Sequence, residues 1–151
     1  MAGRFLAVIS LLTLTLISLA PAALAQDMDM GPLSTAQHPT LGPIVTDANG
    51  LTVYSWAGDT AGAGTSACNG NCAVAWPPVS VDPDMAMGMM DMSSGPAAIQ
   101  REDGSYQLTL NGWPLYRFSG DRAPGDANGN GSNGFGARWS VVNGDSMMPG
   151  M

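Results

Sequence analysis

The chain lacks lysine and has few basic residues of any kind. It contains five arginines, one histidine and twelve acidic residues, which give a formal net charge of −7. Nucleic-acid binding depends on basic side chains that neutralise phosphates, so this balance disfavours nucleic acid as a partner. A single histidine also excludes a zinc centre built on several histidines.

Long hydrophobic runs are also lacking, except for one at the start. Residues 1–25 contain Arg4, an apolar run from Phe5 to Leu19, and the small-residue sequence Ala-Leu-Ala before Gln26. A run of this length is short for a membrane span, and the pattern is typical of an export signal with its cleavage site. We therefore predict a periplasmic or secreted protein that begins near Gln26 and has no transmembrane segment after cleavage.

The sequence has only two cysteines, Cys68 and Cys72. An oxidising compartment favours a disulfide between them, which would close a short loop. The alternative is a reduced thiol pair that binds a soft metal such as Cu(I). The spacing of the cysteines and the alanine that follows Cys72 exclude a c-type haem attachment site.

What the sequence does contain is an internal duplication. The segment YSWAGD at 54–59 recurs as YRFSGD at 116–121, and Trp76 recurs as Trp139 at nearly the same distance. Two aromatic residues separated by one residue lie on the same face of an extended strand, and Gly-Asp favours a turn. Each unit is therefore predicted to begin as a strand that runs into a turn. The predicted core consists of Tyr54, Trp56, Trp76, Trp113, Tyr116, Phe118 and Trp139.

The rest of the pattern indicates strands and turns. Residues 106–110 alternate between apolar and polar, which predicts a half-buried strand, and Asn-Gly pairs at 49–50 and 111–112 predict hairpin turns. We predict an all-β protein in which two similar antiparallel β repeats form one small sandwich or barrel-like domain with flexible tails. The expected segments are a signal (1–25), a flexible arm (26–43), a first repeat (44–81), a methionine-rich inserted loop (82–98), a second repeat (99–142) and a flexible tail (143–151).

Several motifs resemble a family of bacterial exported proteins. They are the paired Tyr-x-aromatic-x-x-Asp, Cys-x-x-x-Cys-Ala-x-x-Trp-Pro-Pro, Asn-Gly-x-Pro-Leu-Tyr and Pro-Gly-Asp-x-Asn-Gly-x-Gly, all within residues 44–142. The family is described as secreted repeats of unknown function, or as predicted lipoproteins with the Tyr-x-aromatic-x-x-Asp motif. The resemblance implies an envelope or secreted location and a duplicated β domain, with almost no biochemistry. This chain departs from the lipoproteins by lacking a lipidated cysteine, and from the bare domain by its methionine clusters.

Methionines gather outside the predicted strands, in polar segments that contain Gly, Pro and Asp. They are Met28, Met30, Met85, Met87, Met89, Met90, Met92, Met147, Met148 and Met151. Core packing gives no reason for methionine in such segments. A thioether is a soft, neutral ligand for Cu(I) or Ag(I) that needs no deprotonation, and two or three of them make one site. These segments resemble the methionine-rich stretches of periplasmic copper-handling proteins.

We therefore predict an exported protein that binds or buffers copper through its methionine segments. His38 lies on the same predicted arm and is a candidate nitrogen ligand. The alternative is that the methionines are incidental or scavenge oxidants. The protein would then be a non-catalytic envelope module that interacts with another envelope protein or a glycan.

A second candidate metal site lies in the Asn-rich loop. Asp126, Asn128 and Asn130 are followed by Gly131 and match the first half of a calcium-binding loop. The twelfth position is Ala137 instead of the acidic residue that completes such a site. Alternating Asn and Gly also suit a tight irregular loop, so both interpretations stay open.

Enzyme motifs are absent from the sequence. It has no Gly-x-Ser-x-Gly, no phosphate loop and no dinucleotide fingerprint. The repeated Asp59 and Asp121 offer a carboxylate pair of the kind that glycosidases use, but an Asp after Gly at a strand end typically accepts backbone N–H bonds in a turn. We therefore predict that the protein is not an enzyme.

Overall fold

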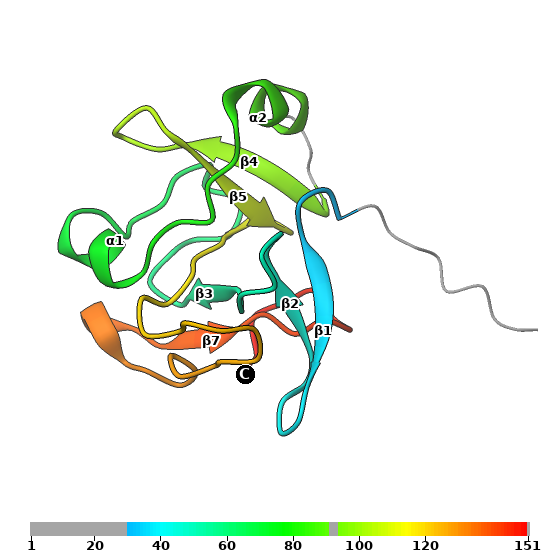
Figure 1. Ribbon diagram of the computed structural model, residues 1–151. Helices are drawn as coiled ribbons and strands as arrows, with labels where there is room; N and C mark the ends of the chain where they lie inside the picture. Colours follow the sequence, from blue (N-terminus) through cyan, green and yellow to red (C-terminus); the bar gives the residue numbers. More distant parts are fainter. Residues whose placement is uncertain (1–29, 91–93, 151) are drawn as a thin grey trace, which may run out of the picture.

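The computed structural model describes residues 30–90 and 94–150. Short strands dominate it, and the helices are few and short (Figure 1). The elements are β1 (Ser34–His38), β2 (Gly42–Thr46), β3 (Tyr54–Trp56), α1 (Asn71–Ala75), α2 (Pro83–Met89), β4 (Pro96–Gln100), β5 (Tyr106–Leu110), β6 (Trp113–Pro114), the 3-10 turn η1 (Gly134–Gly136) and β7 (Trp139–Val141). The prediction of a small all-β domain with antiparallel pairing is confirmed.

Each half of the molecule starts with an antiparallel hairpin. In the first half β1 pairs with β2, from Ser34 opposite Thr46 to the hairpin end; in the second half β4 pairs with β5, from Pro96 opposite Leu110. The predicted turn after β5 is also present. Asn111 and Gly112 both have positive φ, 49° and 82°, as the tight turn between β5 and β6 requires.

The two halves interlock at the centre of the molecule. Tyr54 and Tyr116 pair with each other, and each donates its backbone N–H to the other's carbonyl at 2.8 and 2.9 Å. On the outer sides, Tyr54 pairs with Val141 and Tyr116 pairs with Pro78. Tyr54 therefore lies between segments of the second repeat and Tyr116 between segments of the first, while β4, β5 and β6 form a three-stranded sheet within the second repeat.

Aromatic rings fill the core beneath this interlock. Trp76 and Trp139, equivalent residues of the two repeats, stack with ring centroids 3.9 Å apart and an interplanar angle of 1°. Trp56 stacks on Trp139, while its counterpart Phe118 packs on Trp76. The predicted core is buried except for Trp113 and Phe118, which are half-buried. The aromatic part of the duplication thus forms the junction of the two repeats.

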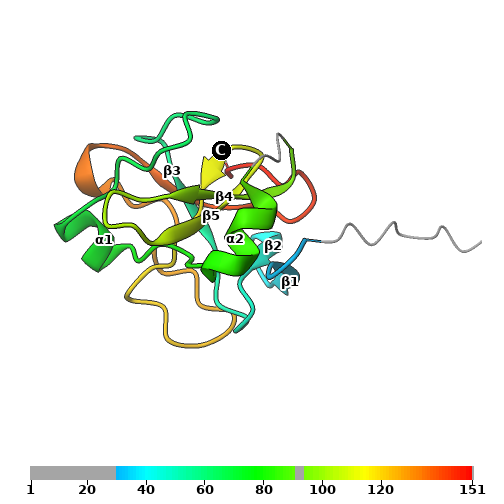
Figure 2. The same cartoon turned by 90° about the horizontal axis from the view of Figure 1, so that it is seen from above.

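A second, aliphatic cluster lies beneath the hairpins. It consists of Leu33, Val45, Val53, Val79, Leu108, Leu110, Leu115 and Val142. The helix α2 packs beside β4 and β5, as Figures 1 and 2 show from two directions. Gln107 and Thr109 are buried as well as Leu108 and Leu110, so β5 is covered on both faces. The prediction of a half-buried strand was wrong. The alternating pattern of β5 does not show that a second element covers its polar face.

Two segments predicted to be irregular contain a strand or helix, and a third folds back onto the domain. The predicted flexible arm contains β1, whose polar residues are mostly exposed and give no apolar alternation. The predicted inserted loop contains α2, where Pro83 occupies the first turn and only Ala86 is buried, followed by the start of β4. The predicted flexible tail folds back as far as Gly150, whose N–H donates to the carbonyl of Val141 at 2.9 Å.

The sequence also predicts that no transmembrane segment remains after cleavage of the signal. Within residues 30–90 and 94–150, no helix combines the length and apolar character needed to cross a bilayer. The predicted signal, residues 1–25, lies outside the described residues.

Candidate functional site

The repeated Tyr and Asp residues bond reciprocally across the two halves. The Tyr54 hydroxyl donates to Asp121 Oδ2 at 2.6 Å, and the Tyr116 hydroxyl donates to Asp59 Oδ2 at 2.5 Å. Burial, followed by the hydrogen bond to Asp121, raises the pKa of Tyr54 above its ordinary value, and burial together with Asp59 does the same for Tyr116. Both hydroxyls therefore stay protonated and act as donors. The motif closes each repeat onto the other.

The remaining oxygens of the two aspartates fix the loops that follow them. Asp59 Oδ1 accepts the backbone N–H of Ala67 at 2.7 Å, and Asp121 Oδ1 accepts that of Asn128 at 2.9 Å. Burial raises the pKa of Asp59, although its hydrogen bonds act in the opposite direction. Both carboxylates thus accept backbone N–H bonds in turns, which is the structural alternative to a catalytic pair that the sequence analysis gave.

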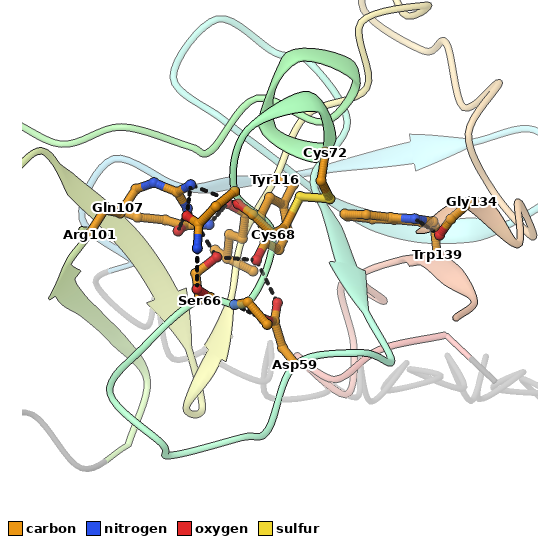
Figure 3. Close-up of a disulfide and its surroundings, with 12 residues drawn as sticks. Asp59, Ser66, Cys68, Cys72, Arg101, Gln107, Tyr116, Gly134 and Trp139 are labelled. Carbon is orange, nitrogen blue, oxygen red and sulfur yellow. Dashed lines mark hydrogen bonds between the residues drawn. A yellow bond between two sulfur atoms is a disulfide. The ribbon is translucent and has the colours of Figure 1, made fainter. Parts of the chain in front are cut away.

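Arg101, which belongs to the second repeat, is the centre of a buried network around the cysteine loop of the first repeat (Figure 3). Its Nη2 donates to the carbonyl of Cys68 at 2.7 Å and to Asn69 Oδ1 at 2.9 Å. Its Nη1 donates to Gln107 Oε1 at 2.6 Å and to Ser66 Oγ at 3.0 Å. A single guanidinium therefore ties the cysteine loop to β5, using four of its five N–H groups.

The network continues from Arg101 to the repeated motif. Ser66 Oγ lies 2.6 Å from the Tyr116 hydroxyl oxygen. Because the single proton of Tyr116 is donated to Asp59, Ser66 is the donor in this contact. Hydrogen bonds consequently run in one direction from Arg101 through Ser66 and Tyr116 to Asp59, so a buried positive charge and a buried carboxylate lie at opposite ends of one chain.

The predicted disulfide between Cys68 and Cys72 is present, with Cα atoms 5.2 Å apart. Both cysteines are buried within the aromatic cluster, and the loop between them leads into α1. Their sulfurs are therefore used in a covalent bond and are not the thiol pair that a soft metal would bind.

The Asn-rich loop uses its oxygens within the protein. Asp126 Oδ2 accepts the backbone N–H groups of Arg122 and Ala123, and these bonds lower the pKa of Asp126. The side chain of Asn128 donates to Asp121, and Asn130 Oδ1 accepts the N–H of Val141 at 3.1 Å. These contacts account for the three residues as loop-forming groups. Calcium binding at Asp126, Asn128 and Asn130 stays a prediction.

His38 lies at the end of the β1–β2 hairpin, beside the Asn-rich loop. Its Nδ1 accepts the backbone N–H groups of Thr40 and Leu41, each at 3.2 Å. A shallow hollow lies between His38 and residues 125–130. The structure thus places His38 at the far end of β1 from Met30, with about 3.3 Å of rise for each strand residue between them. His38 is therefore separated from Met30 by the length of β1.

The methionines divide into two groups. Four have exposed side chains: Met87 at 71%, Met85 at 48%, Met90 at 44% and Met148 at 44%. Three are partly buried and pack against the aliphatic cluster: Met30, Met89 and Met147. Met28, Met92 and Met151 lie outside the described residues. No group of three or more His, Cys, Asp or Glu residues suited to a metal occurs within ranges 30–90 and 94–150.

Arg101 and Gln107 are the residues that sequence reasoning missed. Arg101 stands in an apparently exposed turn sequence next to Glu102 and Asp103, and Gln107 occupies a polar position of an alternating strand. No local signal distinguishes them from solvated residues. Each of them can be buried only because it finds hydrogen-bond partners elsewhere in the fold, and a single sequence does not reveal those partners.

Two β repeats pair with each other through their Tyr residues and the hydrogen bonds of their Asp residues, and a disulfide closes one loop of the first repeat. This arrangement defines a duplicated β module. The chain belongs to the family described as a secreted repeat of unknown function, whose sequence model matches residues 35–80 and again residues 97–143. The protein is accordingly a secreted one. The two matches leave out the segment that carries α2 and its methionines, and the first begins within β1 rather than at residue 44. No curated protein and no solved structure matches the chain.

Proposed function

We propose that this secreted protein binds and buffers Cu(I) through methionine thioethers carried on the duplicated β module. One observation supports the proposal most directly. No methionine belongs to the buried core of the described residues, and four of them have side chains that are 44–71% exposed. Exposing an apolar side chain brings no packing energy, whereas an exposed thioether is available to a soft cation.

The geometry of α2 supports the proposal further. Ala86 is the residue that the helix buries. At about 100° per residue, Met85 and Met89 lie on one side of Ala86, and Met87 and Met90 lie on the other. The helix therefore presents two pairs of neighbouring thioethers. Two sulfurs from one helix and a third from another segment would complete a Cu(I) site.

The proposed function is binding without turnover. Asp59 and Asp121, the acidic pair that repeats in the sequence, are bonded to Tyr116 and Tyr54 and to backbone N–H groups. A catalytic carboxylate must have an oxygen that reaches a substrate. The contacts of these two residues support an architectural role instead.

The test is anaerobic Cu(I) titration of the mature protein against a colorimetric Cu(I) chelator, with native mass spectrometry for stoichiometry. We expect the wild type to take up Cu(I). The quadruple variant Met85→Leu, Met87→Leu, Met89→Leu and Met90→Leu should lose part of this capacity while its circular dichroism is unchanged. Leucine is preferred to deletion of the segment, because Ala86 covers the β-sheet and deletion would uncover it.

Two results would contradict parts of this proposal. A wild-type protein that takes up no Cu(I) refutes the proposed function, and the chain is then an envelope interaction module with incidental methionines. Uptake that the quadruple variant retains in full shows that α2 does not contribute to binding.

A further inference from the structure

Methionines from three distant parts of the chain converge on one cluster. Met30 precedes β1, Met89 ends α2 and Met147 lies in the C-terminal segment, yet all three pack against the aliphatic cluster beneath the hairpins. Figure 2 shows α2 and the start of β1 on the same side of the molecule. We refer to Met30, Met89 and Met147 together as the three-segment methionine site.

The N-terminal member of this site is fixed by a turn. The carbonyl of Met30 accepts the N–H of Leu33 at 3.0 Å, and the Leu33 side chain is buried in the aliphatic cluster. A Cβ atom placed on Gly31 would lie 3.8 Å from Cε of Met89. The tip of the Met89 side chain therefore lies beside Gly31, the residue next to Met30, so these two segments are neighbours.

The C-terminal member is fixed by Asn111. Its Nδ2 donates to the carbonyl of Met147 at 3.0 Å, and its Oδ1 accepts the N–H of Gly95 at 2.9 Å. One amide side chain therefore joins the C-terminal segment to the residues that lead from α2 into β4. Met147 itself has a φ of 53°, a left-handed conformation that a residue of this type adopts at a cost and keeps only where its surroundings hold it.

We infer that the three-segment methionine site is the first and tightest Cu(I) site of the protein, and this rests on the proposed function. Its side chains are already partly immobilised against the cluster, so they lose less rotamer freedom on binding than the exposed methionines do. They are also partly removed from water, which suits neutral thioethers and a monovalent soft cation. The exposed Met85, Met87, Met90 and Met148 then take later equivalents.

The competing explanation is that these three methionines only fill gaps at the edge of the core. Methionine does this readily, and leucine replaces it in volume without supplying a ligand. Replacement by leucine therefore keeps the packing and removes the sulfur, which separates the two explanations. Three of the four exposed methionines provide a control set with the same number of sulfurs.

The experiment compares two triple variants of the mature protein with the wild type. The first is Met30→Leu, Met89→Leu, Met147→Leu, and the control is Met87→Leu, Met90→Leu, Met148→Leu. Each is titrated with Cu(I) under chelator competition and with Ag(I), while the methionine ε-methyl signals are followed by NMR. We expect the first variant to bind the first equivalent at least about tenfold more weakly, which corresponds to about 1.4 kcal/mol. The control should keep the first equivalent and lose later ones.

The NMR signals add a readout that affinity alone does not provide. In the wild type, the ε-methyl signals of Met30, Met89 and Met147 should shift together with the first equivalent of metal, before those of the exposed methionines. If the control variant loses the first equivalent while the first variant keeps it, or if both lose it equally, the inference is overturned and the proposed function stands. If the wild type binds neither Cu(I) nor Ag(I), both are refuted.

Discussion

The two halves of the molecule use the same motif in different surroundings. In the first half, the loop that follows Asp59 is closed by a disulfide and by the buried guanidinium of Arg101. In the second half, the loop that follows Asp121 is closed by backbone N–H groups that donate to the side-chain oxygens of Asp126 and Asn130. The difference shows that the duplicated motif requires a closed loop after it but does not require a particular way of closing it.

The hairpins account for part of this difference. Each hairpin end faces the loop of the opposite repeat: the end of β4 carries Arg101 towards residues 66–69, and the end of β1 carries His38 beside residues 125–130. Arg101 fills its place with a long side chain and four hydrogen bonds. His38 instead bonds to its own turn and leaves a hollow. The first half is therefore the more tightly closed of the two.

Removal of the Arg101 side chain should have the largest effect on the difference between the two halves. Arg101→Met leaves the Cys68 carbonyl and the side-chain oxygens of Asn69 and Gln107 without their donor, and Asp59 without the nearby positive charge. Breaking a buried charged network costs about 3–5 kcal/mol. Urea denaturation with the disulfide intact measures the free energy of unfolding.

The matched control for Arg101 is Arg122→Met, in the loop that follows Asp121. The side chain of Arg122 is exposed, so we expect a change within about 0.5 kcal/mol. Equal losses in the two variants would mean that the guanidinium of Arg101 contributes no more than a surface charge, and that the first half is not the more tightly closed one.

Features with a local sequence pattern were predictable, and features that depend on distant partners were not. The repeated aromatic residues and the Asn-Gly turns predicted β3 around Tyr54 and the start of β6 at Trp113, because period-two patterns and turn residues act locally. The predicted strand did not extend to Tyr116, which makes only isolated bridges. The disulfide followed from the compartment and from the presence of only two cysteines. The strand exchange between the repeats was not predictable, because either repeat pattern is satisfied equally by pairing within itself.

Elements without a local pattern were missed for a physical reason. β1 is exposed on both faces and pairs only with β2, so nothing in its composition distinguishes it from a flexible arm. α2 buries one alanine and has no apolar stripe. The convergence of Met30, Met89 and Met147 was hidden for the same reason, since it depends on where β1, α2 and the C-terminal segment pack.

A smaller effect comes from the repeated glycines before Asp59 and Asp121. A Cβ on Gly58 would overlap the ring of Trp56, and a Cβ on Gly120 would overlap that of Phe118. Forcing a methyl group into a packed site costs about 1–3 kcal/mol. Trp56 is buried and stacked on Trp139, whereas the half-buried Phe118 can move outward. We therefore expect Gly58→Ala to lower the free energy of unfolding more than Gly120→Ala.

The control for the glycine pair is Gly88→Ala in α2. Apart from its chain neighbours and the backbone of α2 itself, nothing lies within 4 Å of the Cβ position there, and alanine favours a helix over glycine by about 1 kcal/mol. This variant should be neutral or slightly more stable in the same thermal and urea experiments. If Gly120→Ala costs as much as Gly58→Ala, the second half is packed as rigidly as the first.

The smallest effect is the difference in acid titration between Asp59 and Asp126. Burial raises the pKa of Asp59 above the ordinary 3.8, so the folded state holds its proton more tightly than the unfolded state does. Its contribution to stability therefore falls as pH rises from about that value through the folded pKa. The backbone N–H groups of Arg122 and Ala123 lower the pKa of Asp126, so its contribution is complete above 3.8 and is lost as pH falls through the folded pKa.

Carboxyl carbon NMR titration measures both pKa values directly, and urea denaturation across the acid range measures the two slopes. As pH rises, the stability of the wild type relative to Asp126→Asn should increase from near zero at low pH. The stability of the wild type relative to Asp59→Asn should decrease over the same rise in pH. Parallel slopes would show that the two aspartates lie in equivalent surroundings. The tighter closure of the first half would then rest on Arg101 and the disulfide alone, with no contribution from the burial of Asp59 itself.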